Sequence, residues 1–258
     1  MRIVSLTCSN TEIVCALGCE DYLVGVDDHS DFPEDVVARC ARVGPDLTVD
    51  IDAIAALKPD MVLASLTVPG HEHNIAALQA AGLPYVVTEP KSLTDIEQDI
   101  LTIGACLGVS DRANHLVQQL KPQLAPTVRP STDFKPRILI QWWPKPVIAP
   151  GNNSWAHDLI EAAGGINALG HDDCESRPMT DEEVAALNPD VIVIAWCGVK
   201  LEKYRPDVVY RNPVFSTVTA IQNQQVFCIS EAFLGRPSPR LVDGLQQLRQ
   251  IVDRLQPA

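Results

Sequence analysis

The segment AALKPDMVLA at Ala55–Ala64 decides the fold, because it returns about 130 residues later as AALNPDVIVI at Ala185–Ile194. Both copies place Ala-Ala-Leu and then Pro-Asp before an apolar run, which is the pattern of a helix that ends and passes into a buried strand. A period of this length is too long for a solenoid repeat and suits a duplicated lobe.

A second pair of segments repeats in the same order. RIVSL at Arg2–Leu6 is echoed by RILIQ at Arg137–Gln141, and each leads through a loop to a helical segment. One helix-Pro-Asp-strand match is explained by an ordinary junction between a helix and a strand. Two matches in the same order favour two similar lobes.

The first lobe alternates apolar strands with helical segments. Short continuous apolar runs predict strands, and segments of helical period predict the helices between them. The strands are expected at 2–6, 22–26, 60–65 and 84–89, and the helices at 11–17, 51–57 and 73–81. This alternation predicts an α/β fold with a mainly parallel, doubly wound sheet. Asn10 or Thr11 is expected to cap the first helix.

The segment between the lobes is helical. A first helix runs to about Leu107, and a second runs from Asp111 to about Leu124 before a proline-rich exit. One helix therefore carries the chain from lobe to lobe. We expect an N-terminal lobe at 1–107, a connecting helix at 108–130 and a C-terminal lobe at 131–258.

The composition is that of an ordinary globular chain. It has 258 residues, a formal net charge of −13 and no cluster of Lys and Arg, which argues against nucleic acid as a partner. No apolar run reaches the roughly 18 residues that span a bilayer. Met1 and Arg2 lead directly into IVSL, which leaves no room for a signal peptide. We expect a cytoplasmic protein, or a periplasmic one if a leader was removed.

The cysteines have neither the spacing of a zinc site nor that of a disulfide framework. No pair shows CxxC spacing, and a chain of this size needs no disulfides to fold. Reduced thiols are expected at Cys8, Cys15, Cys19, Cys40, Cys106, Cys174, Cys197 and Cys228.

Ligands of parallel α/β sheets bind beyond the carboxyl ends of the strands, because helix N-termini and loops gather there. In the first lobe these loops are 7–10, 27–33, 65–72 and 89–92, and in the second they are 141–154, 171–180, 196–200 and 231–240. All four tryptophans of the chain fall on or beside the loops of the second lobe.

The order of several longer segments resembles a known family. They are RIVSLTCSNTEIVCALGCEDYLVGVDDHSDFP, LKPDMVLAS, LGVSDRANHLVQQL and VFSTVTAIQNQQVFCISEAFLGRPSPRLVDGLQQL. Together they resemble the class III periplasmic-type binding proteins of iron-siderophore, haem and vitamin B12 ABC importers, and are most similar to cobalamin-binding or corrinoid-binding proteins. Cys8 departs from the Pro that is usual in the family, and the secretory leader of such receptors is not seen.

The resemblance implies two Rossmann-like lobes joined by one long α-helix, with a metal chelate held in the cleft between them. It implies a non-catalytic, monomeric binding protein that needs no cofactor and delivers cobalamin or another corrinoid to an ABC permease. A ferric siderophore or haem is the alternative ligand. A cytosolic metal-handling or cofactor-handling protein, or an enzyme using the same cleft and its thiols, is the alternative function.

Candidate ligand contacts follow from the loops at the carboxyl ends of the strands. They are Ser9, Asn10, Asp28, His29, Phe32, Ser65, Trp142, Trp143, Trp155, Trp196, Glu231 and Arg236. Aromatic side chains offer a corrin or haem a large contact area at low entropy cost, and packing in the core is the alternative role of each tryptophan. Capping alone explains Ser9 and Asn10, and Arg236 is equally suited to pair with an acid.

Three residues are candidate metal ligands, and one is a candidate for docking. His29 lies among acids after a strand and suits an axial metal ligand, although a solvated loop histidine is the alternative. Cys8 and Cys197 follow strands in different lobes, and small buried fillers are their alternative role. Glu72 suits contact with permease arginines, or else is a favourable acid in the first turn of a helix.

Overall fold

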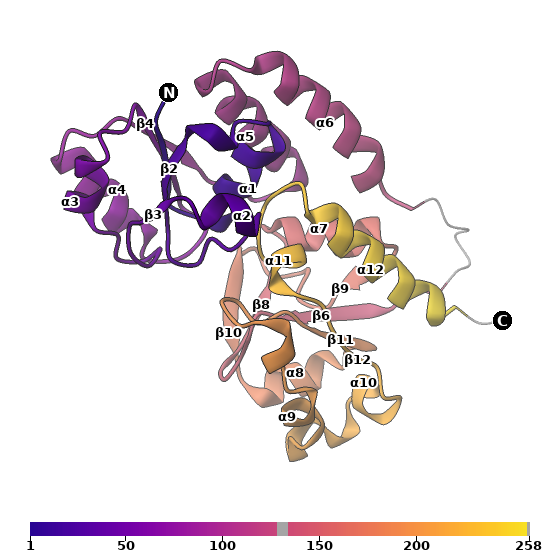
Figure 1. The fold of residues 1–258 in the computed structure, drawn as a ribbon. Helices are drawn as coiled ribbons and strands as arrows, with labels where there is room; N and C mark the ends of the chain where they lie inside the picture. The colour runs from indigo at the N-terminus through magenta and orange to yellow at the C-terminus, as the bar shows by residue number, and fades with distance from the viewer. Residues whose placement is uncertain (128–133, 257–258) are drawn as a thin grey trace. The chain divides into compact units, whose positions relative to one another are not determined.

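The computed structural model describes residues 1–127 and 134–256. The chain divides into two compact units, which we call the first lobe (Met1–Pro90 and Thr94–Leu120) and the second lobe (Lys91–Leu93 and Lys121–Ala258). Each lobe is an α/β structure built on a parallel sheet, as the sequence predicted (Figure 1).

The sheet of the first lobe is entirely parallel and has the strand order β3-β2-β1-β4-β5. The two central strands β1 and β4 are almost wholly buried, which agrees with their continuous apolar sequence. The sequence predicted four of the strands but missed β3, because two exposed residues carry no apolar signal. The strands are β1 (Ile3–Ser5), β2 (Leu23–Val26), β3 (Ala41–Arg42), β4 (Met61–Ser65) and β5 (Tyr85–Thr88).

The first helix begins earlier than predicted. It starts at Cys8 with Thr7 as the N-cap residue, and Thr7 makes no side-chain cap. Asn10 and Thr11 therefore lie inside the helix, and the prediction that either caps it is wrong. The helical segments before the second lobe are α1 (Cys8–Ala16), η1 (Glu20–Tyr22), α2 (Glu34–Val37), α3 (Ile51–Ala56), α4 (His71–Ala80), α5 (Leu93–Cys106) and α6 (Ser110–Leu124).

Helix α6 packs on the first lobe over most of its length. A Cβ atom on Gly104 would overlap the Cβ of Ala113. The backbone of α5 at Gly104 is therefore in direct contact with the Ala113 side chain of α6. Arg112 donates from Nη1 to the carbonyls of Leu17 (3.2 Å) and Gly18 (2.9 Å) at the end of α1. The expected connecting segment 108–130 thus joins the first lobe as far as Leu120, and its residues 128–130 lie outside the described part of the chain.

The second lobe holds a parallel sheet of order β12-β11-β6-β9 and a small antiparallel sheet of order β10-β8-β7. The antiparallel sheet corrects the prediction that 141–154 and 171–180 are loops, since both contain paired strands. The strands are β6 (Arg137–Gln141), β7 (Trp143–Pro144), β8 (Val147–Pro150), β9 (Ile166–Asn167), β10 (Ser176–Met179), β11 (Val191–Ile194) and β12 (Val226–Cys228).

Helices surround the sheets of the second lobe, with α12 packed beside α7 and α11 (Figure 1). Thr180 caps α8 by accepting from the backbone N–H of Glu183, whose side chain accepts in return from the Thr180 N–H. The helical segments are α7 (Trp155–Ala162), α8 (Asp181–Leu187), η2 (Leu201–Lys203), α9 (Pro206–Tyr210), η3 (Pro213–Thr217), α10 (Thr219–Gln222), α11 (Glu231–Leu234) and α12 (Leu241–Arg254).

The repeated segment has the same structure in both lobes. In each copy a helix ends at a residue in the left-handed region, Lys58 (φ 48°) or Asn188 (φ 44°), before Pro-Asp leads into a central strand. That strand, β4 or β11, pairs in parallel with β1 or β6, the strands that begin with the echoed RIVSL and RILIQ segments. The sequence repeat therefore corresponds to a repeated helix-strand unit, as predicted.

Candidate ligand-binding site

Three loops meet at the carboxyl edge of the first sheet. His29 follows β2, Asp46 follows β3, and His71 is the first residue of α4, after β4. The two carboxylate oxygens of Asp46 lie 3.5 Å from Nε2 of His29 and 3.6 Å from Nε2 of His71. One carboxylate therefore stands between two imidazoles contributed by different loops.

The three side chains differ sharply in exposure. The side chain of His71 is 3% exposed, that of Asp46 is 27% exposed, and that of His29 is 51% exposed. The interaction with His71 lowers the pKa of Asp46, burial opposes this, and the positive charge of His29 adds to it. The separation of 3.6 Å is that of an ion pair and is longer than a conventional hydrogen bond.

The loop that carries His29 is held by the buried Asp27. One carboxylate oxygen of Asp27 accepts from the Ser30 hydroxyl, and the other accepts from the His29 backbone N–H at 2.9 Å. Arg42 donates from Nη1 to the carbonyls of Asp27 (2.8 Å) and Ser30 (2.7 Å). Burial raises the pKa of Asp27, and its hydrogen bonds oppose that rise. These hydrogen bonds hold the backbone of the loop, and His29 and its neighbour Asp28 are exposed on it.

Large apolar side chains are exposed on the same three loops. Phe32 is 44% exposed, Leu47 is 43% exposed and Val68 is 41% exposed. Exposed hydrophobic residues near a few polar groups are typical of a site for a partly apolar ligand. Sequence reasoning named Phe32 but neither of the other two. Leu47 follows the unrecognised strand β3, and Val68 lies in the loop after β4, where the sequence does not show which side chains are exposed.

Three predicted contacts are instead part of the interior of the first lobe. Asn10 donates from Nδ2 to the Ala64 carbonyl (3.0 Å) and accepts from the Thr88 hydroxyl (3.2 Å). Ser9 and Ser65 are buried, and their hydroxyls lie within hydrogen-bond distance of Thr7 (3.2 Å) and Thr67 (3.0 Å) respectively. These polar groups are satisfied within the lobe. Contact of Ser9, Asn10 and Ser65 with a ligand stays a prediction.

The tryptophans of the second lobe divide into structural and exposed members. Trp155 is buried and donates its indole N–H to the Leu234 carbonyl at 2.8 Å. Trp196 is buried, donates to Oε1 of Gln141 at 3.1 Å and packs on Tyr204. Both have the packing role in the core that was the alternative for each tryptophan, and their contact with a ligand stays a prediction.

Trp142 and Trp143 lie just after β6, at the edge of the second sheet, and stay candidate ligand contacts. Trp142 is half-buried, and its ring centroid lies 5.9 Å from that of Trp155. Trp143 is 42% exposed. The hairpin β7-β8 fixes both residues, since the backbone N–H of Trp142 donates to the Ile148 carbonyl and its carbonyl accepts from the Cys197 N–H. Neighbours in an extended chain point to opposite sides, which explains their different exposure.

Arg236 and Glu231 form a nearly buried ion pair. Arg236 donates from Nε (3.1 Å) and Nη2 (2.7 Å) to Oε1 of Glu231, and the side chains are 9% and 12% exposed. The neighbouring Arg240 lies over the ring of Phe233 at 4.8 Å. Of the two roles weighed for Arg236, pairing with an acid is the one that the structure displays. Contact of Arg236 and Glu231 with a ligand stays a prediction.

The remaining candidates are described residue by residue. Glu72 is exposed at the start of α4, and its Oε2 accepts from the Gly70 N–H at 2.8 Å. Its own backbone N–H, and then that of Gly70, lower the pKa of Glu72. Cys8 begins α1 and Cys197 is exposed after β11. Among the described residues, no group of three or more His, Cys, Asp and Glu side chains is placed to hold a metal ion. Ligation by His29, Cys8 or Cys197 stays a prediction.

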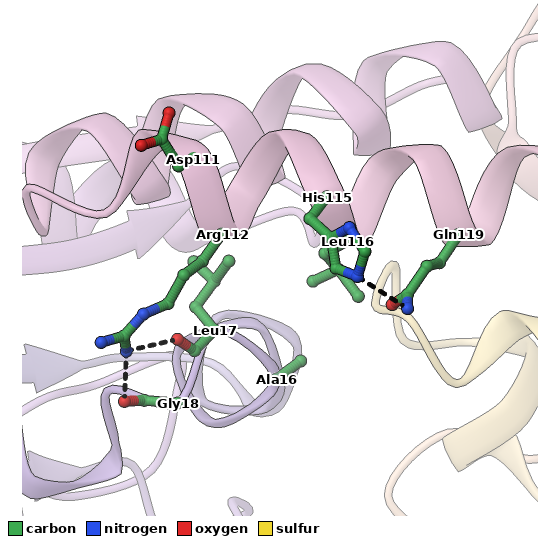
Figure 2. A pocket seen from close by; sticks show the side chains of 8 residues that line it. All are labelled: Ala16, Leu17, Gly18, Asp111, Arg112, His115, Leu116 and Gln119. Atoms are coloured by element: carbon green, nitrogen blue, oxygen red, sulfur yellow. Dashed lines mark hydrogen bonds between the residues drawn. The ribbon is translucent and has the colours of Figure 1, made fainter.

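A hollow of about 460 Å³ lies elsewhere on the first lobe, between the end of α1 and the face of α6. Figure 2 shows Arg112 reaching from α6 to the last carbonyls of α1, and Gln119 beside His115 one turn along. Because α1 starts at the carboxyl end of β1 and runs back, its last turn lies at the opposite edge of the sheet. The lining residues are Ala16, Leu17, Gly18, Asp111, Arg112, His115, Leu116 and Gln119.

Comparison with known families decides the identity of the chain. The model of the periplasmic binding protein family matches residues 3–232. The chain belongs to this family. It is therefore a binding protein without catalytic function, and the alternative of an enzyme that uses the same thiols gives way.

Matches to relatives within this family extend over almost all of the chain. A substrate-binding lipoprotein of an ABC transporter from Bacillus subtilis, YvrC, is 30% identical over 266 residues, which are 97% of this chain and 79% of the relative. The vitamin B12-binding protein of Vibrio cholerae is 26% identical over 263 residues, which are 96% of this chain and 87% of the relative.

Solved structures agree with the fold. The haem-binding protein RhuT from Roseiflexus has a TM-score of 0.82 and is 27% identical, with 97% of each chain covered. The vitamin B12-binding protein BtuF of Vibrio cholerae has a TM-score of 0.76 and is 25% identical, with 98% of this chain and 96% of that chain covered. Among the residues that the structure describes, no helix is long and apolar enough to cross a membrane.

Proposed function

We propose that this protein is the substrate-binding component of an ABC importer and that its ligand is a metal chelate, most specifically a corrinoid. The observation that carries the proposal is the edge of the first sheet, where exposed Phe32, Leu47 and Val68 lie on the same three loops as His29, Asp46 and His71 respectively. The relative named for vitamin B12 supports the corrinoid, and the relative named for haem makes haem the competing ligand.

The chemistry of these residues suits a broad ligand with an apolar face and polar edges. Apolar side chains contribute binding free energy through buried area, while a few polar groups fix the orientation of the ligand. On the second lobe, Trp143 and the half-buried Trp142 offer aromatic contact of the same kind. The proposed contacts of the first lobe are Asp28, His29, Phe32, Leu47 and Val68, and those of the second lobe, each proposed for its own lobe, are Trp142 and Trp143.

Retention of a coloured ligand tests the proposal. Purified protein is mixed separately with hydroxocobalamin, haemin and a ferric hydroxamate siderophore, and each mixture is passed through gel filtration. We expect the cobalamin spectrum to elute with the protein at about one ligand per chain, with a Kd in the micromolar range or below. Retention of haemin or the siderophore in place of cobalamin would overturn the corrinoid assignment, and retention of none of the three would overturn the chelate class.

We further propose that Glu72 contacts the permease. Its carboxylate is exposed and the backbone at Gly70 holds it, so it presents a fixed negative charge on the first lobe. Opposite charges of this kind steer encounter and set the register of two proteins. The proposed complex places one monomer of the binding protein on the permease, and light scattering tests the monomeric state.

The proposed compartment is the one in which the named relatives act, outside the cytoplasmic membrane. It is supported by the description of those relatives as periplasmic proteins or as a lipoprotein. The cytoplasmic expectation rests on the start of the sequence and on free thiols. Fractionation of the native host with detection of the protein by antibody distinguishes the two.

A further inference from the structure

The hollow between α1 and α6 is a feature of the first lobe that the proposed function does not use. Its volume of about 460 Å³ is in the range of small-molecule sites in proteins. All of its lining residues belong to the first lobe, and they lie at the edge of the sheet opposite to the loops that carry His29 and Asp46. A molecule bound in the hollow would therefore meet none of the proposed chelate contacts.

The lining of the hollow combines a cation, apolar surface and a polar pair. Figure 2 shows Arg112 and His115 extending from one side of α6 toward the last turn of α1, as residues three apart on a helix do. Leu17, which is buried, and Leu116, which is half-buried, add apolar surface to the lining. Gln119 donates from Nε2 to Nε2 of His115 at 3.0 Å. The cation and the polar pair thus lie one helical turn apart.

The end of α1 holds the guanidinium of Arg112 in place. Gly18 has a φ of 65°, in the left-handed region that favours glycine, and the chain leaves the helix there. The carbonyls of Leu17 and Gly18 both accept from Nη1 of Arg112, at 3.2 Å and 2.9 Å. Because both contacts use the same nitrogen, the guanidinium is oriented before any ligand arrives, which lowers the entropy cost of binding.

The other edge of this guanidinium is the one that binds a carboxylate side-on. Nε and Nη2 of Arg112 have no acceptor among the described residues, and the side chain is exposed, so a ligand can reach this edge from solvent. In Arg236 the same two nitrogens donate to Oε1 of Glu231 at 3.1 Å and 2.7 Å. The carboxylate of Asp111 points away from Arg112 in Figure 2. A carboxylate of a ligand is therefore the partner that this edge fits.

We propose that this hollow is a second binding site and that it takes a small monocarboxylate with an apolar body. The carboxylate pairs with the Nε and Nη2 edge of Arg112, and the apolar body covers Leu17 and Leu116. The charged pair fixes the direction of the ligand, and burial of the apolar body contributes binding free energy. A cation with the same body would meet the guanidinium with like charge, and an anion without the body would lose the contact with the two leucines.

Titration of the full chain with hexanoate, followed by amide NMR spectra at about pH 7, tests the inference, because the carboxylate is then ionised. We expect saturable shifts confined to residues 16–18 and 111–119, with a Kd of about 1 mM, which is typical for a ligand of this size. Acetate lacks the apolar body and hexylammonium has the opposite charge. Each should bind about ten-fold more weakly than hexanoate.

Two variants remove the site in different ways. Ala16→Trp fills the hollow and changes neither Arg112 nor the carbonyls that it contacts, while Arg112→Gln removes the guanidinium. Each should weaken hexanoate binding by about ten-fold. Ala80→Trp is the matched control, because Ala16 and Ala80 are both exposed, both end a helix, and both precede a glycine with a φ of 65° two residues later. Thermal melts confirm that every variant is folded.

The site is supported if Ala16→Trp and Arg112→Gln both weaken hexanoate binding and Ala80→Trp binds as wild type does. It is overturned if wild type shows no saturable shifts, if acetate or hexylammonium binds as well as hexanoate, or if either of the first two variants keeps the wild-type Kd. Retention of hydroxocobalamin by the same variants should equal that of wild type, because the hollow shares no residue with the proposed chelate contacts. Failure of the chelate proposal therefore leaves this inference standing, and the reverse also holds.

Discussion

The indole N–H of Trp155 donates to the carbonyl of Leu234 at 2.8 Å, which ties the start of α7 to the end of α11. The neighbouring Trp142 contacts the ring of Trp155, yet its own indole N–H has no hydrogen-bond partner among the described residues. Trp155 and Trp142 are in contact, but among the described residues only the indole N–H of Trp155 makes a hydrogen bond that stabilises the fold.

Replacing each of these tryptophans by Phe should separate their roles. Trp155→Phe removes a hydrogen bond and leaves the Leu234 carbonyl unsatisfied, so the free energy of unfolding should fall by about 1 to 2 kcal/mol. Trp142→Phe removes no hydrogen bond, so it should cost less than Trp155→Phe, by about 1 kcal/mol. Urea unfolding followed by circular dichroism measures both. Equal losses for the two variants would contradict the assignment.

Trp143 should matter for the ligand and not for the fold. Its side chain is 42% exposed, so Trp143→Ala is expected to leave the unfolding midpoint unchanged and to weaken chelate binding by about ten-fold. Tyr210 is a matched control, because it is an aromatic residue of the same lobe with 37% exposure. Titration calorimetry should show that Tyr210→Ala binds as wild type does. Unchanged binding by Trp143→Ala would exclude Trp143 from the site.

Asp99 on α5 should make the protein less stable at alkaline pH. Burial, with a smaller contribution from the charge of Asp95, raises the pKa of Asp99 to about 7. Because the folded state favours the protonated form, stability falls as the pH rises from about 4, the pKa of an aspartate in an unfolded chain, to about 7. Asp99→Asn, which mimics the neutral form, should be more stable than wild type at pH 8 by about 1 kcal/mol, after allowance for screening by solvent.

The pH dependence of that difference is the decisive measurement. Near pH 3, below the pKa of Asp99 in both the folded and the unfolded chain, the difference in midpoint between the two proteins in thermal melts should be at its smallest, since Asp99 is then mostly protonated in both states. Asp21, whose side chain is 88% exposed, is the control, and Asp21→Asn should change stability little at either pH. A constant difference between Asp99→Asn and wild type at all pH values would show that the carboxyl does not titrate as expected.

Glu72 should affect transport without affecting ligand affinity. Glu72→Gln keeps an oxygen that accepts from Gly70 but removes the exposed charge, so the Kd for the chelate should not change. Uptake by the reconstituted importer should fall by about ten-fold if the charge docks on the permease. Glu182, an exposed acid in the first turn of α8, is the control, and Glu182→Gln should support normal uptake. Normal uptake with Glu72→Gln would remove the docking role.

Continuous apolar runs and the long repeat were enough to predict the α/β class, the central strands and the two lobes. RILIQ became β6 at the predicted residues, and Lys58 and Asn188 end equivalent helices in the left-handed region. These features are local, since they depend on the hydrophobic period and on the Pro-Asp that follows each helix.

The short strands were beyond this reasoning. β3 at Ala41–Arg42 is exposed and β7 at Trp143–Pro144 contains a proline, so neither has the apolar signal of a buried strand. Each is a strand only because a neighbouring strand offers hydrogen bonds to its backbone. Pairing between segments is a tertiary property, and the sequence window around either strand does not contain it.

The sequence by itself determined that this chain folds as two related α/β lobes and where loops gather at the strand ends. Only the tertiary structure decided which side chains on those loops remain available to a ligand. Asn10 is buried and hydrogen-bonded inside the first lobe, and Trp155 is buried in the core of the second. His71 lies against Asp46, which is 25 residues away in the chain. Hydrophobic period reports which segments are buried, but the partner of each polar atom depends on which loops the strand order brings together.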